Sequence, residues 1–397
     1  MLGGETLMTI RVAAATAVMI GCLGLVPAAH AAEKVKVGLL LTLSGPPAAL
    51  GVQAKNGFEL AMKELGGKLG GLEAEIVTAD DELKPDVALT RVKGLIERDH
   101  VNFVVGPIFS NIMQAVAKPV SESSAFLISP NAGPSNFAGK QCNKNLFVVS
   151  YQNDQNHEVL GKYAQDKGFK KLFLLAPNYQ AGKDSLAGVK RYFKGEIADE
   201  VYVPLGQLDF SAELAKIAAA KPDAVFAFMP GGMGVNLVKQ YRQAGLADTT
   251  PFLSAFTTDE STLPAQKDAA LGFLGGSNWA PTMDNPQSKA FVTAYEAAYG
   301  GQVPGSYAMH GYDTALLLDS AIKAVGGKLA DHDGLRKALE AADFKSLRGA
   351  FKFGANHYPV QDFYLVKVAK RGDKFETEIV QKVFENYTDP YVKDCKM

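Results

Sequence analysis

Short apolar stretches alternate with longer amphipathic stretches through most of this chain. Residues 35–41 form the first apolar stretch, and residues 52–65 then place Phe58, Leu60 and Leu65 at helical spacing. The alternation continues with strands expected at 72–79, 103–105, 125–128 and 146–149, and with helices expected at 85–98 and 111–121. Apolar strands separated by helices are typical of a parallel sheet that helices cover on both faces.

A second series of alternating elements begins near residue 154. It predicts helices at 154–168, 182–193, 211–220 and 234–244, and strands at 171–175, 200–205, 224–228, 252–254 and 272–277. Two such series predict an α/β fold with two doubly wound parallel-sheet lobes. Two successive helices (286–300 and 306–325) and strand-like segments at 348–353, 362–368 and 375–384 then follow. We expect this last part of the chain to cross back and complete both sheets.

The N-terminal segment has a different pattern. Arg11 precedes the apolar run 12–26, and small residues ending at Ala31 follow it. This order predicts a secretory signal peptide over residues 1–31, cleaved after Ala31, with Met8 as a possible true start. A membrane anchor is the alternative, although the run is short for one, and lipidation at Cys22 is another. The mature protein is therefore expected in the periplasm.

Composition and charge limit the classes of function. The 397 residues are 47% hydrophobic and 21% charged, which is ordinary for a globular protein. The 41 basic and 42 acidic residues leave a net charge of −1, so the chain has no basic excess for binding nucleic acid. After removal of residues 1–31, two cysteines remain, Cys142 and Cys395. An even number in an exported protein predicts one disulfide, with two free thiols as the alternative.

The sequence lacks the common catalytic motifs. It has no G-x-S-x-G elbow, no Walker A loop and no H-E-x-x-H helix, and the glycine run at 231–234 lacks the spacing of a dinucleotide-binding loop. The six histidines are scattered, without metal-ligand spacing. We therefore expect no enzyme, no metal and no cofactor. An exported protein of two α/β lobes is expected to bind a ligand at the carboxyl ends of its strands, between the lobes.

Two loops are candidates for binding an anion. Residues 106–110 follow one predicted strand and open a helix, and residues 129–133 follow the next strand. Backbone N–H groups at helix starts attract anions, and Ser110 adds a hydroxyl donor. An ordinary helix cap is the alternative role of Ser110.

Several motifs together resemble a known family. They are VKVGLLLTLSGPPAALG, KNGFELAMKEL, VVGPIFS, FLISPNAGP, APNYQAGKD, PDAVFAFMPGG and HGYDTALLLDSAI, which stand in the family's order between residues 35 and about 353. The chain resembles the type I periplasmic solute-binding proteins of ABC importers, in the branched-chain amino-acid-binding group. This resemblance implies a monomer that delivers its ligand to an importer permease. It also implies a three-segment hinge between lobe 1 (33–150 and 280–354) and lobe 2 (151–279 and 355–397).

The resemblance also implies roles for individual residues. Amino-acid binders of the family hold the ligand carboxylate with the serine at the position of Ser110. The position of Gly133 commonly carries Thr or Ser, and an acidic residue that binds the ammonium group commonly stands where Phe256 stands here. Asp259 would restore a carboxylate if the alignment shifts by a few residues. The two departures argue against an α-amino acid as the ligand.

Aromatic residues in the remaining loops suit a flat ligand. Tyr151, Tyr179 and Tyr307 would pack around an aromatic ring, although core packing is the alternative for each of them. The PNAGP and NYQAGKD motifs and the C-terminal cysteine resemble the aromatic-acid-binding branch of the family. The ligand is thus expected to be a small aromatic carboxylate of benzoate or phenylpropenoate type. A branched-chain or other amino acid, and a ligand-sensing role in a signalling system, are the alternatives.

The residues expected to bind the ligand come from the loops that follow the strands. They are Ile108, Phe109, Ser110, Asn131, Ala132, Gly133, Tyr151, Tyr179, Met229, Pro230, Phe256 and Tyr307.

Overall fold

The structure is a computed structural model that describes residues 1–6, 8 and 34–397. The predicted signal peptide, its cleavage site and Cys22 lie outside the described residues, apart from 1–6 and 8. Lys34–Met397 form one compact unit, to which the following description refers. Within the described residues, no helix has both the length and the apolar character that a membrane span requires.

The first lobe is built on a six-stranded sheet of order β2-β3-β1-β4-β5-β6. Its strands run parallel, except that the short β2 is antiparallel to β3. In β1 every residue but Lys36 is buried, as expected for a strand that helices cover on both faces. The elements are β1 (Val35–Leu41), α1 (Ala48–Glu64), β2 (Lys68–Leu69), β3 (Leu72–Asp80), α2 (Pro85–Glu97), β4 (Phe103–Val105), α3 (Ser110–Ser121), β5 (Phe126–Ser129), α4 (Ser135–Ala138) and β6 (Leu146–Val148).

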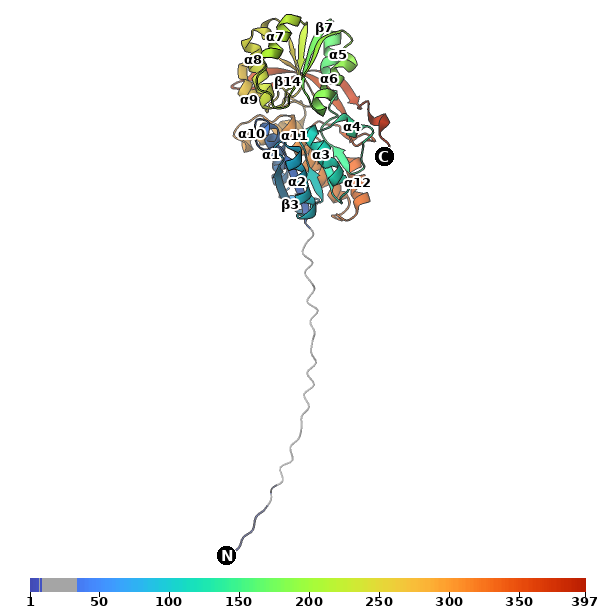
Figure 1. Ribbon diagram of the computed structural model, residues 1–397. Coiled ribbons are helices and arrows are strands. Elements are labelled where there is room, and N and C mark those ends of the chain that lie inside the picture. Colours follow the sequence, from blue (N-terminus) through green and yellow to red (C-terminus); the bar gives the residue numbers. More distant parts are fainter. Residues whose placement is uncertain (7, 9–33) are drawn as a thin grey trace. The chain divides into compact units, whose positions relative to one another are not determined.

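The second lobe is built on an eight-stranded sheet of order β12-β13-β11-β10-β9-β7-β8, with β14 paired to β13. β7 to β11 run parallel, and β13 is antiparallel to β11, β12 and β14. The elements up to β11 are α5 (Gln155–Asp166), β7 (Lys171–Pro177), α6 (Gln180–Tyr192), β8 (Glu196–Val203), α7 (Ser211–Ala220), β9 (Ala224–Ala227), α8 (Gly232–Gln243), β10 (Phe252–Leu253), α9 (Leu263–Gln266) and β11 (Leu274–Ser277). Figure 1 shows α5 to α8 around this lobe and α1 to α3 around the first.

The last part of the chain contributes helices to one lobe and strands to the other. α10 (Pro286–Ala298), α11 (Ser306–Ala324) and α12 (His332–Ala341) belong to the first lobe, where α11 packs along α1. β12 (Lys352–Phe353), β13 (Pro359–Arg371) and β14 (Lys374–Tyr387) all join the second sheet. The expectation that the late strands complete both sheets is therefore wrong. A short turn joins β13 to β14, and strands connected in this way pair with each other and share one sheet.

Within residues 34–397 the chain passes between the two sheets after β6, after β11 and after α12. Buried hydrogen bonds tie these passages together at the carbonyl of Ser150. It accepts from Asn278 Nδ2 at 3.1 Å, Gln361 Nε2 at 2.7 Å and Arg348 Nη1 at 3.2 Å. The passages therefore share one polar centre, while the lobe limits at residues 150, 279 and 354 stay predictions.

The predicted disulfide is present between Cys142, in the loop after α4, and Cys395, near the end of the chain. Hydrogen bonds hold the same C-terminal tail. Asn356 Nδ2 donates to Asp389 Oδ2 at 2.9 Å, and the Tyr391 hydroxyl donates to Asp154 Oδ2 at 2.8 Å. Polar contacts and a covalent bond thus fix the tail together with the partly buried Tyr391, which packs against the core.

Candidate functional site

A cavity with about 370 Å³ of space between protein atoms lies where loops of both lobes meet. This figure counts all the space between the lining atoms, including space open to solvent. The wall is formed by Leu50, Ile108, Phe109, Ser110, Asn131, Ala132, Tyr151, Asn153, His157, Tyr179, Ala181, Phe228, Pro230, Phe256 and Tyr307. Most of them follow the carboxyl ends of parallel strands, the usual place for a ligand in an open α/β sheet.

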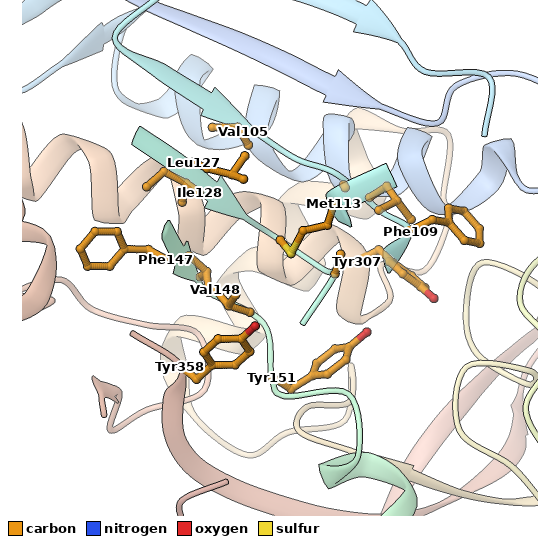
Figure 2. Packing of buried hydrophobic residues seen from close by; sticks show 14 of the residues in the cluster. Val105, Phe109, Met113, Leu127, Ile128, Phe147, Val148, Tyr151, Tyr307 and Tyr358 are labelled. Carbon is orange, nitrogen blue, oxygen red and sulfur yellow. The ribbon is translucent and has the colours of Figure 1, made fainter. Parts of the chain in front are cut away.

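All the predicted ligand residues except Gly133 and Met229 line this cavity. Figure 2 shows three of them, Phe109, Tyr151 and Tyr307, at one end of the buried cluster, beyond the strand residues Val105 and Ile128. The structure thus brings together residues from seven separate loops or helix starts in the described part of the chain. That they bind a ligand stays a prediction.

Gly133 lies behind the cavity wall, and its backbone does not serve as a donor to a ligand. Its N–H donates to Asn153 Oδ1 at 3.1 Å. A Cβ at this position would lie 2.0 Å from the carbonyl oxygen of Tyr151. Glycine is therefore required by the close approach of the segment at residue 151, and the side chain of a Thr or Ser would not fit here.

Met229 points away from the cavity into the core of the second lobe. It stands between Phe228 and Pro230, which both line the cavity. Successive residues of extended chain face opposite sides, so the two neighbours of Met229 share one side and Met229 takes the other. The same alternation identifies Phe228 as a wall residue that the sequence analysis missed.

The structure adds four further residues that the sequence analysis did not select. Leu50 comes from the start of α1, and Ala181 from the start of α6. Asn153 lies just before α5, and His157 lies in the first turn of that helix. Both are polar residues at a helix start, where capping is the commonest role, and the only sequence signal was their position just after Tyr151.

Hydrogen-bond donors gather at the starts of α3 and α6. Ser110 is 2% exposed and is the first residue of α3, which no side chain caps. Within the described residues, the backbone N–H groups of Ser110 and Ala181 have no backbone acceptor. Each helix start carries a partial positive charge, and one helix comes from each lobe. Because no Lys or Arg among the described residues lines the cavity, these dipoles and the Ser110 hydroxyl are what would attract an anion.

Aromatic rings form most of the remaining wall. Tyr151 stacks on Phe256 with ring centroids 5.0 Å apart and planes at 21°. Tyr179 packs beside Phe228 at 6.3 Å and 23°, and Phe256 lies 6.0 Å from Tyr307. Flat walls of this kind favour a flat apolar ligand, which can pack against them face to face or face to edge.

The hydroxyl groups of Tyr179 and Tyr307 have no hydrogen-bond partner among the described residues. Burial raises the pKa of both phenols, and for Tyr307 well above its usual range, so both stay neutral and can donate. The Tyr151 hydroxyl is already used, since it donates to Asn131 Oδ1 at 2.5 Å. Tyr179 and Tyr307 therefore add donors to the cavity without adding charge.

His157 is a neutral residue of the wall. Burial lowers its pKa to about 3. Its ring meets Phe226 at 5.5 Å with planes at 90° and Phe228 at 5.2 Å with planes at 62°, which places it among aromatic rings. At neutral pH the imidazole therefore offers hydrogen bonding but no positive charge.

Phe256, and not Asp259, faces the cavity. Asp259 lies in the wall of a separate cavity behind Phe256, together with Glu260. Burial raises the pKa of Asp259, and one carboxylate oxygen accepts from the backbone N–H of Ser261 at 2.8 Å. No Asp or Glu lines the main cavity, so the described residues offer no counter-charge there for an ammonium group.

Two α/β lobes whose loops together line one cavity are the architecture of a solute-binding protein. The chain belongs to the periplasmic binding protein family, whose model matches residues 34–373. It is an ABC-transporter solute-binding protein of the branched-chain amino-acid-binding group. The fold and family expected from the sequence are thus confirmed.

Curated relatives and solved structures agree on this family. A Leu/Ile/Val-binding protein homologue of Brucella melitensis is 29% identical over 91% of this chain and 94% of its own length. A solute-binding protein of R. palustris, solved in complex with benzoate, is 34% identical with a TM-score of 0.87, over 92% of this chain and 100% of that chain. Another, from Rhodopseudomonas palustris BisB5 in complex with 3,4-dihydroxybenzoic acid, is 31% identical with a TM-score of 0.85, over 90% and 99%.

A branched-chain amino-acid-binding protein is also similar. It is the substrate-binding protein of a branched-chain amino acid transporter from Streptococcus pneumoniae, in complex with isoleucine. It is 26% identical with a TM-score of 0.78, over 88% of this chain and 100% of that chain.

Proposed function

We propose that this protein captures a small aromatic carboxylate, of benzoate or phenylpropenoate type, between its two lobes. The carboxylate would lie against Ser110 and the start of α3, and the ring would lie between Tyr151, Phe256 and the other aromatic walls. The protein would then deliver the acid to the permease of an ABC importer.

The observation that carries this proposal is the composition of the cavity wall. It combines aromatic rings on several sides with donors at two helix starts, and among the described residues it has no Asp, Glu, Lys or Arg, while its one histidine, His157, is neutral. A carboxylate satisfies the donors, because hydrogen bonds from helix N-termini and hydroxyl groups favour an anion. A benzene ring satisfies the walls, because its faces and edges pack against aromatic side chains.

An α-amino acid fits this cavity less well. Its ammonium group would be buried without a carboxylate, since Asp259 lies in the separate cavity behind Phe256. Burying an unpaired charge costs several kcal/mol, on the order of the desolvation penalties seen inside proteins. The solved relatives that bind benzoate and dihydroxybenzoate are also more similar to this chain than the relative that binds isoleucine.

A thermal-shift panel tests the proposal. The panel contains benzoate, benzamide, which lacks the negative charge, cyclohexanecarboxylate, which lacks the aromatic ring, and leucine, which is an α-amino acid. A ligand at 100 times its dissociation constant adds about 2.7 kcal/mol, which for a chain of this size raises the melting temperature by roughly 3–4 °C. We expect a shift with benzoate, a much smaller one with benzamide and none with leucine. A shift with leucine alone would refute the aromatic ligand and support the amino-acid alternative.

The remaining parts of the proposal concern location and assembly. We infer export to the periplasm by the segment 1–31, action as a monomer and no catalytic role. N-terminal sequencing of the exported protein checks the cleavage after Ala31, and light scattering checks the monomer. Recovery of the bound acid unchanged after long incubation checks that no reaction occurs.

A further inference from the structure

A buried carboxylate joins the two lobes beside the cavity. Asp184 lies on α6 of the second lobe and is 4% exposed. It accepts two hydrogen bonds from Ser135 of α4 in the first lobe, from the backbone N–H at 3.1 Å and from the hydroxyl at 2.7 Å. No Lys, Arg or His in the described part of the chain forms an ion pair with Asp184, so hydrogen bonds alone stabilise its charge.

Asn153 connects this carboxylate to Ser110. The orientation of the Asn153 amide is fixed, because its oxygen accepts from the N–H of Gly133, and a backbone N–H can only donate. The amide nitrogen therefore donates its two protons, one to Ser110 Oγ at 3.1 Å and one to Asp184 Oδ2 at 2.9 Å. A continuous chain of hydrogen bonds thus runs from the cavity wall to Ser135.

This arrangement determines what Ser110 can offer a ligand. A serine hydroxyl has one proton and two acceptor sites, and Asn153 donates to one of those sites. The Ser110 proton has no acceptor among the described residues, and the residue lines the cavity. The hydroxyl therefore has its proton free to donate to a bound molecule, which suits a carboxylate, while only one acceptor site is left for the NH₂ group of an amide.

Opening of the lobes would separate the same groups. Ser135 moves with the first sheet and Asp184 with the second, so both bonds between them break when the lobes part. Gln180 Nε2, at 2.8 Å, belongs to the same helix as Asp184 and stays with it. Water would have to replace the donors of Ser135 in the open state.

We propose that Asn153 and Asp184 are positioning residues. In this proposal, Asn153 fixes the Ser110 hydroxyl as a donor, and Asp184 ties that arrangement to Ser135, so that carboxylate binding and lobe closure stabilise each other. The inference rests on the proposed carboxylate ligand and adds the residues that link its recognition to closure.

Two substitutions and a matched control test this link by titration calorimetry with benzoate and benzamide. Asp184→Ala should weaken benzoate binding about tenfold or more, the range for a lost hydrogen bond to a charged group. Lys183→Ala changes the exposed neighbour on the same helix and should bind within about twofold of the wild type. If Asp184→Ala binds benzoate with the same affinity as Lys183→Ala, the proposal is overturned.

Asn153→Ala has a signature that a merely structural role would not produce. It releases the Ser110 hydroxyl, which can then rotate and accept from an amide. Benzoate should bind more weakly, while the ratio of the benzamide to the benzoate dissociation constant should fall at least about threefold. An unchanged ratio would contradict the role given to Asn153.

Two further measurements keep the test decisive. If Asp184→Ala does not fold, Ser135→Ala removes one of the two bonds from the other lobe and should also weaken benzoate. If the wild type binds neither ligand, the proposed function fails, and the link is judged by hydrogen exchange without ligand. Exchange at the Ser135 amide about tenfold faster in Asp184→Ala than in the wild type would support it, and equal exchange would refute it.

Discussion

The substitution Ser110→Ala tests the proposed contact between this serine and a ligand carboxylate. It removes a hydroxyl that is 2% exposed, lines the cavity and already accepts from Asn153 Nδ2 at 3.1 Å. A hydrogen bond to a charged group contributes about 1.5–3 kcal/mol, so binding of benzoate should weaken roughly 10- to 150-fold. Asn153 keeps its bond to Asp184, so the fold should remain intact.

Titration calorimetry of the purified mature chain measures this effect. Ser185→Ala is a matched control, because Ser185 is also a fully buried serine but donates to the carbonyl of Gly182, away from the cavity. The control should lose some stability and keep its affinity. If Ser110→Ala binds benzoate within twofold of the wild type, the anion is held elsewhere and the reasoning is wrong.

Further predictions concern the ligand, closure, stability and the tail. Phe256→Glu should weaken benzoate by adding a negative charge to the cavity wall, as calorimetry would show. Gly232→Ala should also weaken it, because a Cβ there would lie 2.8 Å from Pro46 Cβ of the other lobe, whereas Gly94→Ala, which has room, should not. Burial raises the pKa of Glu260 from 4.5 to about 7. The folded state then holds a proton that the unfolded state releases between these values, so stability falls as pH rises through them. Glu260→Gln should therefore raise the free energy of unfolding at pH 8 by up to about 3 kcal/mol, which a higher melting temperature would show. The same substitution should have little effect at pH 4. An equal gain in melting temperature at both pH values would refute this reasoning. Cys142→Ser should lower the melting temperature, and an unchanged value would show that hydrogen bonds alone fix the tail.

The sequence predicted the alternating core of both lobes because strands buried on both faces leave an almost continuous apolar run, as in β1. It did not predict where the late strands pair. The pairing of β13 with β11 depends on contacts between distant segments, which no local pattern records. The strand-like segments were visible, but their sheet was not.

The sequence predicted the residues whose position in the chain alone places them at the cavity. It did not predict correctly the residues whose place depends on packing. Ser110 and Phe256 follow strands directly, so topology places them at the cavity. Gly133 and Met229 follow strands too, yet close packing behind Tyr151 and the alternation of extended chain turn them away. Asn153 was missed because its three hydrogen bonds go to residues distant in sequence.

The most direct test of the central claim is a calorimetric titration of the purified mature protein with benzoate and, separately, with leucine. In the part of the chain that the structure describes, the cavity has aromatic walls, donors at two helix starts and no acidic side chain. The account therefore predicts saturable binding of one benzoate per chain and no heat of binding with leucine. Saturable binding of leucine, with none of benzoate, would contradict it.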